Sequence, residues 1–300
     1  MFLFKKYSLV CLVFFILACD NEQEQIKNEN TKPSDDQPST LIPDEVIYDI
    51  IHSMSSPIET ANQLVKAKVP YKSEFLNAPE NALNYNSEQK MALNLGILGA
   101  DLGYVNMYHQ KATSLLYMGA VKLLADGLKL GKFFDISTLK SLNKNSENID
   151  TIIYYTNKSF EEINQYLKNQ KRPEVSSEIL LGGWLESLYL ATKMYRLYPG
   201  KELKETIGQQ KITLDNIYLI YSTYQNKKSF KELINNINDL KKIYDKINIT
   251  YQYHPPTSKE VNGVLVVQDN SKNSIEITDQ HILEISSLTE IIRNKMIEKE

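Results

Sequence analysis

Apolar residues recur at helical spacing along most of this 300-residue chain. From residue 42 onward they stand three and four positions apart, which places them on one face of a helix with about 3.6 residues per turn. We expect helices over residues 42–54, 57–69, 87–108, 110–130, 148–169, 173–198, 202–224, 229–247 and 279–300, with short helical turns near 135–142. Such repeated amphipathic segments predict a mainly α fold, an antiparallel multi-helix bundle.

A strand pattern occurs in one place, near the C-terminus. The runs 263–268 and 274–278 are rich in residues that favour strands, and a polar segment, 269–273, separates them. This arrangement predicts one small β-hairpin at about 263–278 that packs on the helices, because an isolated hairpin is only marginally stable. Thr278 then stands where it can cap the final helix.

Glycines interrupt two of the most apolar helices, although glycine in a helix interior costs up to about 1 kcal/mol relative to alanine. The helix expected at 87–108 contains Gly96, Gly99 and Gly103, which are spaced three and four apart on one face. The helix expected at 173–198 contains Gly182 and Gly183, next to Trp184. We expect these faces to let the two helices cross closely; the alternative is that the glycines open space for a ligand beside Trp184.

The same two helices carry polar residues that could form a site. Asp101 interrupts an apolar stretch, and His109 follows eight residues later on nearly the same face. The candidate ligand-binding residues are Asp101, Tyr104, Tyr108, His109, Trp184 and Glu186. The simpler interpretation is that Asp101 accepts a structural hydrogen bond from a neighbouring helix, as buried polar groups usually do. The 19 tyrosines suit either a binding groove or the wet rim of an ordinary bundle.

No known catalytic or cofactor motif occurs in the sequence. The four histidines are scattered, none has metal-site spacing, and the fingerprints of serine hydrolases, P-loop proteins and dinucleotide-binding proteins are missing. We therefore assign no catalytic residue, no metal ligand and no cofactor. A net charge of −3, with lysines and acids interspersed, gives no electrostatic basis for binding nucleic acid.

The first 18 residues have the layout of a bacterial lipoprotein signal peptide. Lys5 and Lys6 precede an apolar run, Leu9–Leu17, that is too short to span a bilayer, which takes about 20 residues. The segment Ile16–Cys19 ends with a small residue directly before a cysteine. The resemblance to lipoprotein signals implies cleavage before Cys19 and lipid on its sulfur, which would leave the mature chain with no other cysteine.

Residues 19–41 are expected to be the lipidated cysteine and a disordered acidic tether, since 20–40 contain one aliphatic residue. A flexible coil of this length holds the helical domain, 42–300, roughly 25 Å from the membrane. The acidic residues after Cys19 resemble the export signals of surface lipoproteins of Bacteroidetes, whereas Asp20 resembles an inner-membrane retention signal of other bacteria. We expect a lipid-anchored protein of the cell envelope, in the outer membrane under the first resemblance.

Three segments resemble a family of uncharacterised, mostly helical lipoproteins of Bacteroidetes. They are LGILGADLGY at 95–104, FFD at 133–135 and LLGGWLE at 180–186. The resemblance covers roughly residues 45–300 and implies a helical fold and an envelope location. It brings no activity, cofactor or catalytic residue.

Two functions of different class fit these observations. The first is a non-enzymatic envelope lipoprotein whose domain binds an envelope protein or a small ligand, and the missing catalytic motifs favour it. The second is an enzyme with a carboxylate, tyrosine and histidine site near Asp101 and Trp184. The second function requires these side chains to converge on one open pocket.

Cys19→Ala tests the anchor. Without the thiol no lipid can be attached, so the variant should leave the membrane fraction and lose palmitate labelling, because stable anchoring depends on the acyl chains. Cys11→Ala is the control, since Cys11 lies within the segment expected to be removed. Continued palmitate labelling of Cys19→Ala would contradict the prediction.

Overall fold

The computed structural model describes residues 42–54, 57–134, 149–261, 264–268, 270 and 272–299. The signal peptide, the tether and the helical turns near 135–142 that the sequence predicts lie outside the described residues. The architecture below is that of the unit formed by residues 40–300.

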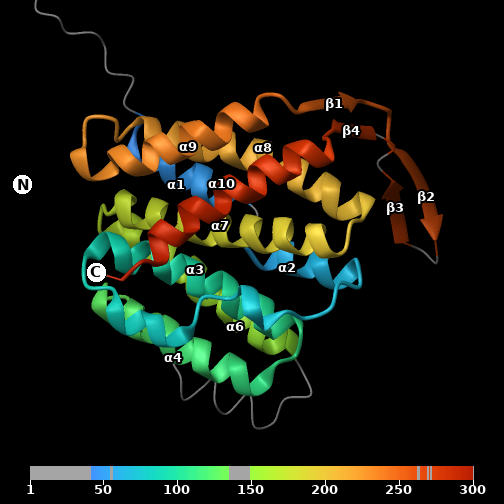
Figure 1. Cartoon of the computed structure of the whole chain (residues 1–300). Helices are drawn as coiled ribbons and strands as arrows, with labels where there is room; N and C mark the ends of the chain where they lie inside the picture. The colour runs from blue at the N-terminus through green and yellow to red at the C-terminus, as the bar shows by residue number, and fades with distance from the viewer. Residues whose placement is uncertain are drawn as a thin grey trace, which may run out of the picture. The chain divides into compact units, whose positions relative to one another are not determined.

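Helices make up most of the described chain (Figure 1). The α-helices are α1 (Asp44–Ser53), α2 (Pro57–Lys66), α3 (Glu88–Met107), α4 (Lys111–Gly127), α6 (Ile149–Asn169), α7 (Pro173–Leu197), α8 (Lys201–Ser222), α9 (Lys231–Tyr244) and α10 (Asp279–Ile297). The short 3-10 turns are η1 (Ser73–Phe75), η2 (Pro79–Asn84), η3 (Gly131–Phe133) and η4 (Lys228–Phe230). The mainly α prediction is confirmed, with helix ends shifted by a few residues. None of the described helices is long and apolar enough to cross a membrane.

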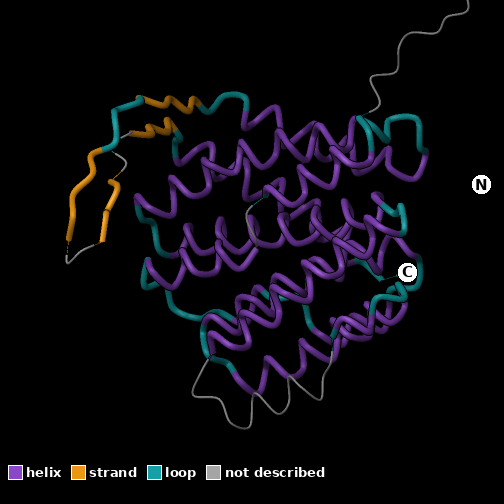
Figure 2. Tube along the Cα trace, turned by 180° about the vertical axis from the view of Figure 1, so that it is seen from behind, coloured by secondary structure: helices purple, strands orange, loops and turns teal. Residues whose placement is uncertain are grey.

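Helices α3 and α7 form the centre of the bundle. Every residue of α3 from Ala92 to Asn106 is buried, and so is every residue of α7 from Leu181 to Thr192. Helices α4 and α6 lie on one side of this pair, and α8 and α9 lie on the other (Figures 1 and 2). The buried apolar residues accordingly form two clusters, one with α8, α9 and α10 and the other with α4 and α6.

Glycines set the distance between α3 and α7. A Cβ atom at Gly96 would clash with the carbonyl oxygen of Ile179 and would stand 2.6 Å from the amide nitrogen of Gly183. A Cβ atom at Gly182 would clash with the carbonyl oxygen of Leu93. Because these are backbone atoms, they cannot yield as a flexible side chain does. The close crossing that the glycine pattern predicts is therefore confirmed at Gly96 and Gly182.

The strands pair differently from the prediction. They are β1 (Asn248–Gln252), β2 (Thr257–Val261), β3 (Val264–Gln268) and β4 (Lys272–Glu276). Strand β3 matches the first predicted run, and β4 overlaps the second at 274–276. However, β3 pairs with β2 and β4 pairs with β1, both antiparallel. The expected pairing across 269–273 was wrong. Each run instead pairs with a strand that precedes it in the sequence, β1 or β2, and these two strands are more polar and show no clear strand pattern. Pro255 and Pro256, which lack N–H donors, separate the two ladders.

The ladder of β1 and β4 is held against the helices. Gly208 of α8 leaves room for Ile275 of β4, whose Cγ2 lies 2.6 Å from where a Cβ of residue 208 would stand. After β4, Thr278 caps α10 as predicted. Its hydroxyl accepts a hydrogen bond from the N–H of His281 at 3.1 Å, and His281 Nδ1 accepts one from the N–H of Thr278 at 3.4 Å. These reciprocal bonds form a capping box.

Substitution of the crossing glycines tests this packing. Gly96→Ala and Gly182→Ala should each destabilise the fold by about 2–3 kcal/mol, the upper part of the usual cost of overpacking, because the two backbones must separate. Gly119 of α4 is the matched control, since nothing lies within 4 Å of a Cβ placed there. Gly119→Ala should instead stabilise the helix by up to about 1 kcal/mol.

Urea denaturation measures the free energy of unfolding of all three variants. Equal stabilities for Gly96→Ala and Gly119→Ala would contradict the close crossing.

Candidate functional site

A buried ion pair joins α10 to α7. Arg293 Nε donates to Glu186 Oε2 at 2.6 Å, and Arg293 Nη2 donates to Glu186 Oε1 at 2.8 Å and to the carbonyl of Phe75 at 3.1 Å. The Glu186 side chain is 0% exposed and that of Arg293 is 5% exposed. The guanidinium also lies over the ring of Tyr189, with Cζ 4.3 Å from the ring centroid. This two-point pairing satisfies both oxygens of the Glu186 carboxylate.

Asp101 of α3 is fully buried beside this pair. Its Oδ2 accepts a hydrogen bond from the N–H of Asn77 at 3.0 Å, while its Oδ1 has no hydrogen-bond partner among the described residues. Burial, and then the negative charge of Glu186, raise the pKa of Asp101 well above its usual value. Because Arg293 is already paired with Glu186, an ionised Asp101 would give the cluster a net negative charge in the core. We infer that Asp101 is protonated, which leaves the cluster neutral.

The Asn77 backbone that Asp101 binds is held from several sides. The Asn77 carbonyl accepts a hydrogen bond from Tyr117 Oη at 2.8 Å, and the Asn77 side chain donates to Tyr85 Oη at 3.3 Å and accepts from Asn81 Nδ2 at 2.7 Å. Tyr85 in turn donates to the carbonyl of Ile297 at 3.1 Å. Asp101 therefore takes part in a polar network that fixes the segment between α2 and α3 to α4 and α10.

Two of the candidate tyrosines belong to an aromatic cluster next to α2. The rings of Tyr71 and Tyr104 stack with centroids 5.4 Å apart, and those of Tyr104 and Tyr108 lie 4.7 Å apart. Tyr104 Oη accepts from the N–H of Lys72 at 2.9 Å, and Tyr108 Oη donates to the carbonyl of Val69 at 2.7 Å. Both hydroxyl groups thus bind the backbone that follows α2.

The remaining candidate residues lie elsewhere. His109 is exposed in the turn after α3 with a φ of 56°. Trp184 packs in the cluster that contains α8, and its Nε1 donates to Gln210 Oε1 at 3.0 Å. The structure therefore brings Asp101 and Glu186 together but does not gather all six residues in one open pocket. Their role in binding stays a prediction.

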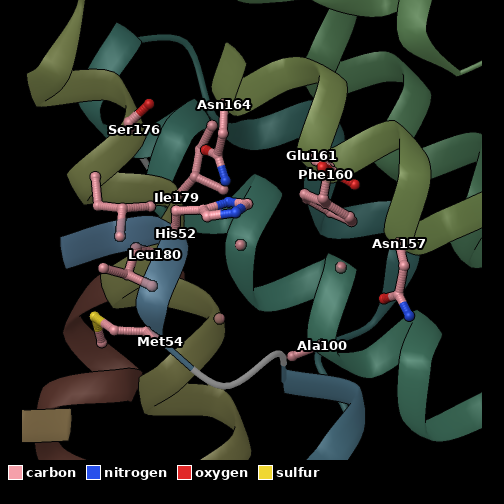
Figure 3. A pocket seen from close by; sticks show the side chains of 14 residues that line it. His52, Met54, Ala100, Asn157, Phe160, Glu161, Asn164, Ser176, Ile179 and Leu180 are labelled. Carbon is pink, nitrogen blue, oxygen red and sulfur yellow. The ribbon is translucent and has the colours of Figure 1, made fainter. Parts of the chain in front are cut away.

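A pocket of about 250 Å³ opens where α1, α3, α6 and α7 meet (Figure 3). Its apolar lining consists of Ile51, Met54, Gly96, Gly99, Ala100, Phe160, Ile179, Leu180 and Gly183. Three of these residues are glycines, so the face that lets α3 and α7 cross also leaves space beside the crossing. Trp184 is not part of the lining, which places this space away from the position that the ligand alternative predicted.

Five polar residues also line the pocket. They are His52 of α1, Asn157, Glu161 and Asn164 of α6, and Ser176 of α7. The exposed side chains of His52, Asn157 and Glu161 mark the mouth, and Figure 3 shows the His52 imidazole extending into the space between α1 and α3. Ser176 is 1% exposed, and its hydroxyl has no hydrogen-bond partner among the described residues.

Sequence reasoning missed every polar residue of the pocket. Asn157, Glu161 and Asn164 lie at spacings of four and three on α6, a pattern shared with any solvent-facing helix surface. Ser176 lies in an apolar stretch and belongs to no motif. The glycines were the one available signal, and they pointed first to packing.

Asp101→Asn tests the inferred protonation. A raised pKa means that the folded protein keeps a proton that the unfolded chain releases above about pH 4. Wild-type stability should therefore fall as pH rises above this value, by up to about 1.4 kcal/mol per pH unit until the folded-state pKa is reached. The variant lacks this proton, so its stability relative to wild type should increase between about pH 5 and pH 8. Urea denaturation across this range makes the comparison, and parallel pH profiles would exclude a protonated Asp101.

Comparisons with known proteins identify no relative. No family model, no curated protein and no solved structure matches this chain. Within the described residues, no group of three or more His, Cys, Asp and Glu side chains is placed to hold a metal ion.

Proposed function

We propose that this protein is a lipid-anchored envelope lipoprotein whose helical domain binds a small organic molecule, without catalysis, in the pocket between α1, α3, α6 and α7. The pocket itself carries the proposal, because a space of about 250 Å³ stays open beside the close crossing of α3 and α7. Protein interiors keep few voids larger than a water molecule.

The composition of the pocket supports the same proposal. Binding sites for small molecules are mostly apolar, with a few polar groups that fix the orientation of the ligand. Here glycine, isoleucine and leucine residues of α3 and α7 form the apolar surface, and amide, imidazole, carboxylate and hydroxyl groups stand around it. A volume of about 250 Å³ lies near the lower end of the usual range, about 300–1,000 Å³, which favours a ligand of few atoms.

The polar groups of the pocket favour binding over catalysis. A general base works best when a second group orients it and when its proton acceptor faces the substrate. Among the described residues, neither His52 nor Glu161 has a hydrogen-bond partner that would hold it in one orientation. Asp101 and Glu186, the carboxyl groups of the enzyme alternative, are buried in the core and absent from the lining.

The anchoring part of the proposal rests on Cys19 and the acidic segment after it. Helix α1 is the first described helix after this segment, and it contributes Ile51, His52 and Met54 to the pocket. A tether of roughly 25 Å would let the domain meet its ligand near the membrane surface.

Filling the pocket tests the function. Leu180 is half-buried in the lining, whereas Leu197 is exposed at the end of the same helix. Leu180→Trp should abolish binding of 2-phenylethanol, an uncharged probe with an apolar ring, and Leu197→Trp should leave it unchanged.

Saturation-transfer NMR on the mature protein in lipid nanodiscs detects this binding, with empty nanodiscs as the control for partitioning. Binding that survives Leu180→Trp would place the probe elsewhere. If the wild-type protein bound neither 2-phenylethanol nor 2-phenylethylamine, the proposed function would be overturned.

A further inference from the structure

Among the described residues that line the pocket, one carries a carboxylate and none is a lysine or arginine. The carboxylate belongs to Glu161 of α6, at the exposed mouth. Its neighbour Glu162 pairs with Lys158 at 3.8 Å, whereas Glu161 forms no ion pair among the described residues. The lining therefore presents an uncompensated negative charge to whatever enters the pocket.

An aromatic ring lines the pocket from the same helix. Phe160 directly precedes Glu161 on α6, and both residues belong to the lining (Figure 3). The ring reaches this position because Gly99 has no side chain: a Cβ there would be 2.5 Å from Phe160 Cζ. Phe134 meets the ring edge-on with centroids 5.5 Å apart, which further fixes its orientation. The Phe160 ring and the Glu161 carboxylate together are the combination that attracts an ammonium group.

The other polar groups of the pocket are compatible with such a ligand. Asn157, Glu161 and Asn164 are spaced four and three residues apart on α6, so an amide side chain follows the carboxylate on each side along the helix. The glycine faces of α3 and α7 and the side chain of Ile179 leave an apolar surface for the rest of the ligand.

We propose that the ligand of this pocket is a small primary amine, with its ammonium group between Glu161 and Phe160 and its apolar body against the glycine faces of α3 and α7. This inference rests on the proposed function and specifies its ligand class. It requires that, among ligands with the same apolar body, a positively charged head group improves binding and a negatively charged head group prevents it.

Three probes with one ring and different head groups test the inference. They are 2-phenylethylamine, 2-phenylethanol and 3-phenylpropanoate, which are cationic, neutral and anionic at neutral pH. Calorimetric and NMR titrations of the mature protein in nanodiscs of uncharged lipid, at low ionic strength, should give about five- to tenfold tighter binding of the amine than of the alcohol. The carboxylate should not bind.

Two variants locate the charge effect. Glu161→Gln should lower the affinity for the amine to that for the alcohol and leave the alcohol unchanged. Glu162→Gln, which removes the same charge one residue away and outside the lining, should change the affinity for the amine by less than twofold. The preference for the amine should also shrink at high salt, because exposed charges are screened.

The outcomes separate this inference from the proposed function. Binding of the alcohol that depends on Leu180, with no advantage for the amine, would overturn the amine inference and keep the binding function. Equal effects of Glu161→Gln and Glu162→Gln would also overturn it. Because Glu161 is exposed, unchanged melting temperatures of both variants confirm that lost binding is not lost folding.

Discussion

The close crossing of α3 and α7 is the contact on which the rest of the domain depends. Two backbones meet at Gly96 and Gly182 with no side chain between them. Both helices are therefore enclosed by their neighbours, and the apolar core is divided into two clusters on either side of the pair. Each outer helix then needs only one apolar face, which is why α6 and α9 have clear amphipathic patterns.

The same constraint explains both the pocket and the buried cluster. Helices this close leave little room at the crossing and an uneven surface beside it, which α1 and α6 cover incompletely. Close packing and an open space beside it thus occur on the same glycine-bearing helices, although the space is not next to Trp184, where the ligand alternative placed it. Farther along the same pair, Asp101 and Glu186 are fully buried, and among the described residues the compensating charge comes from Arg293.

The fold could be predicted where information is local. Helix positions follow from spacing, and the Thr278 cap follows from its place before an apolar run. The hairpin pairing could not be predicted, because β1 and β2 are polar and only their partners identify them as strands. The role of Arg293 could not be predicted either, because this residue is 107 positions from Glu186 and resembles any charged residue of an amphipathic helix.

The separation between Glu186 and Arg293 also sets an order of events. When α7 has been synthesised, the Glu186 carboxylate has no cation, because residue 293 is made 107 residues later. Enclosing that charge early would cost several kcal/mol. The Glu186 carboxylate is therefore compensated as an ion only when α10 is in place. The buried centre of the domain thus depends on a helix that is made after both of the helices that cross there.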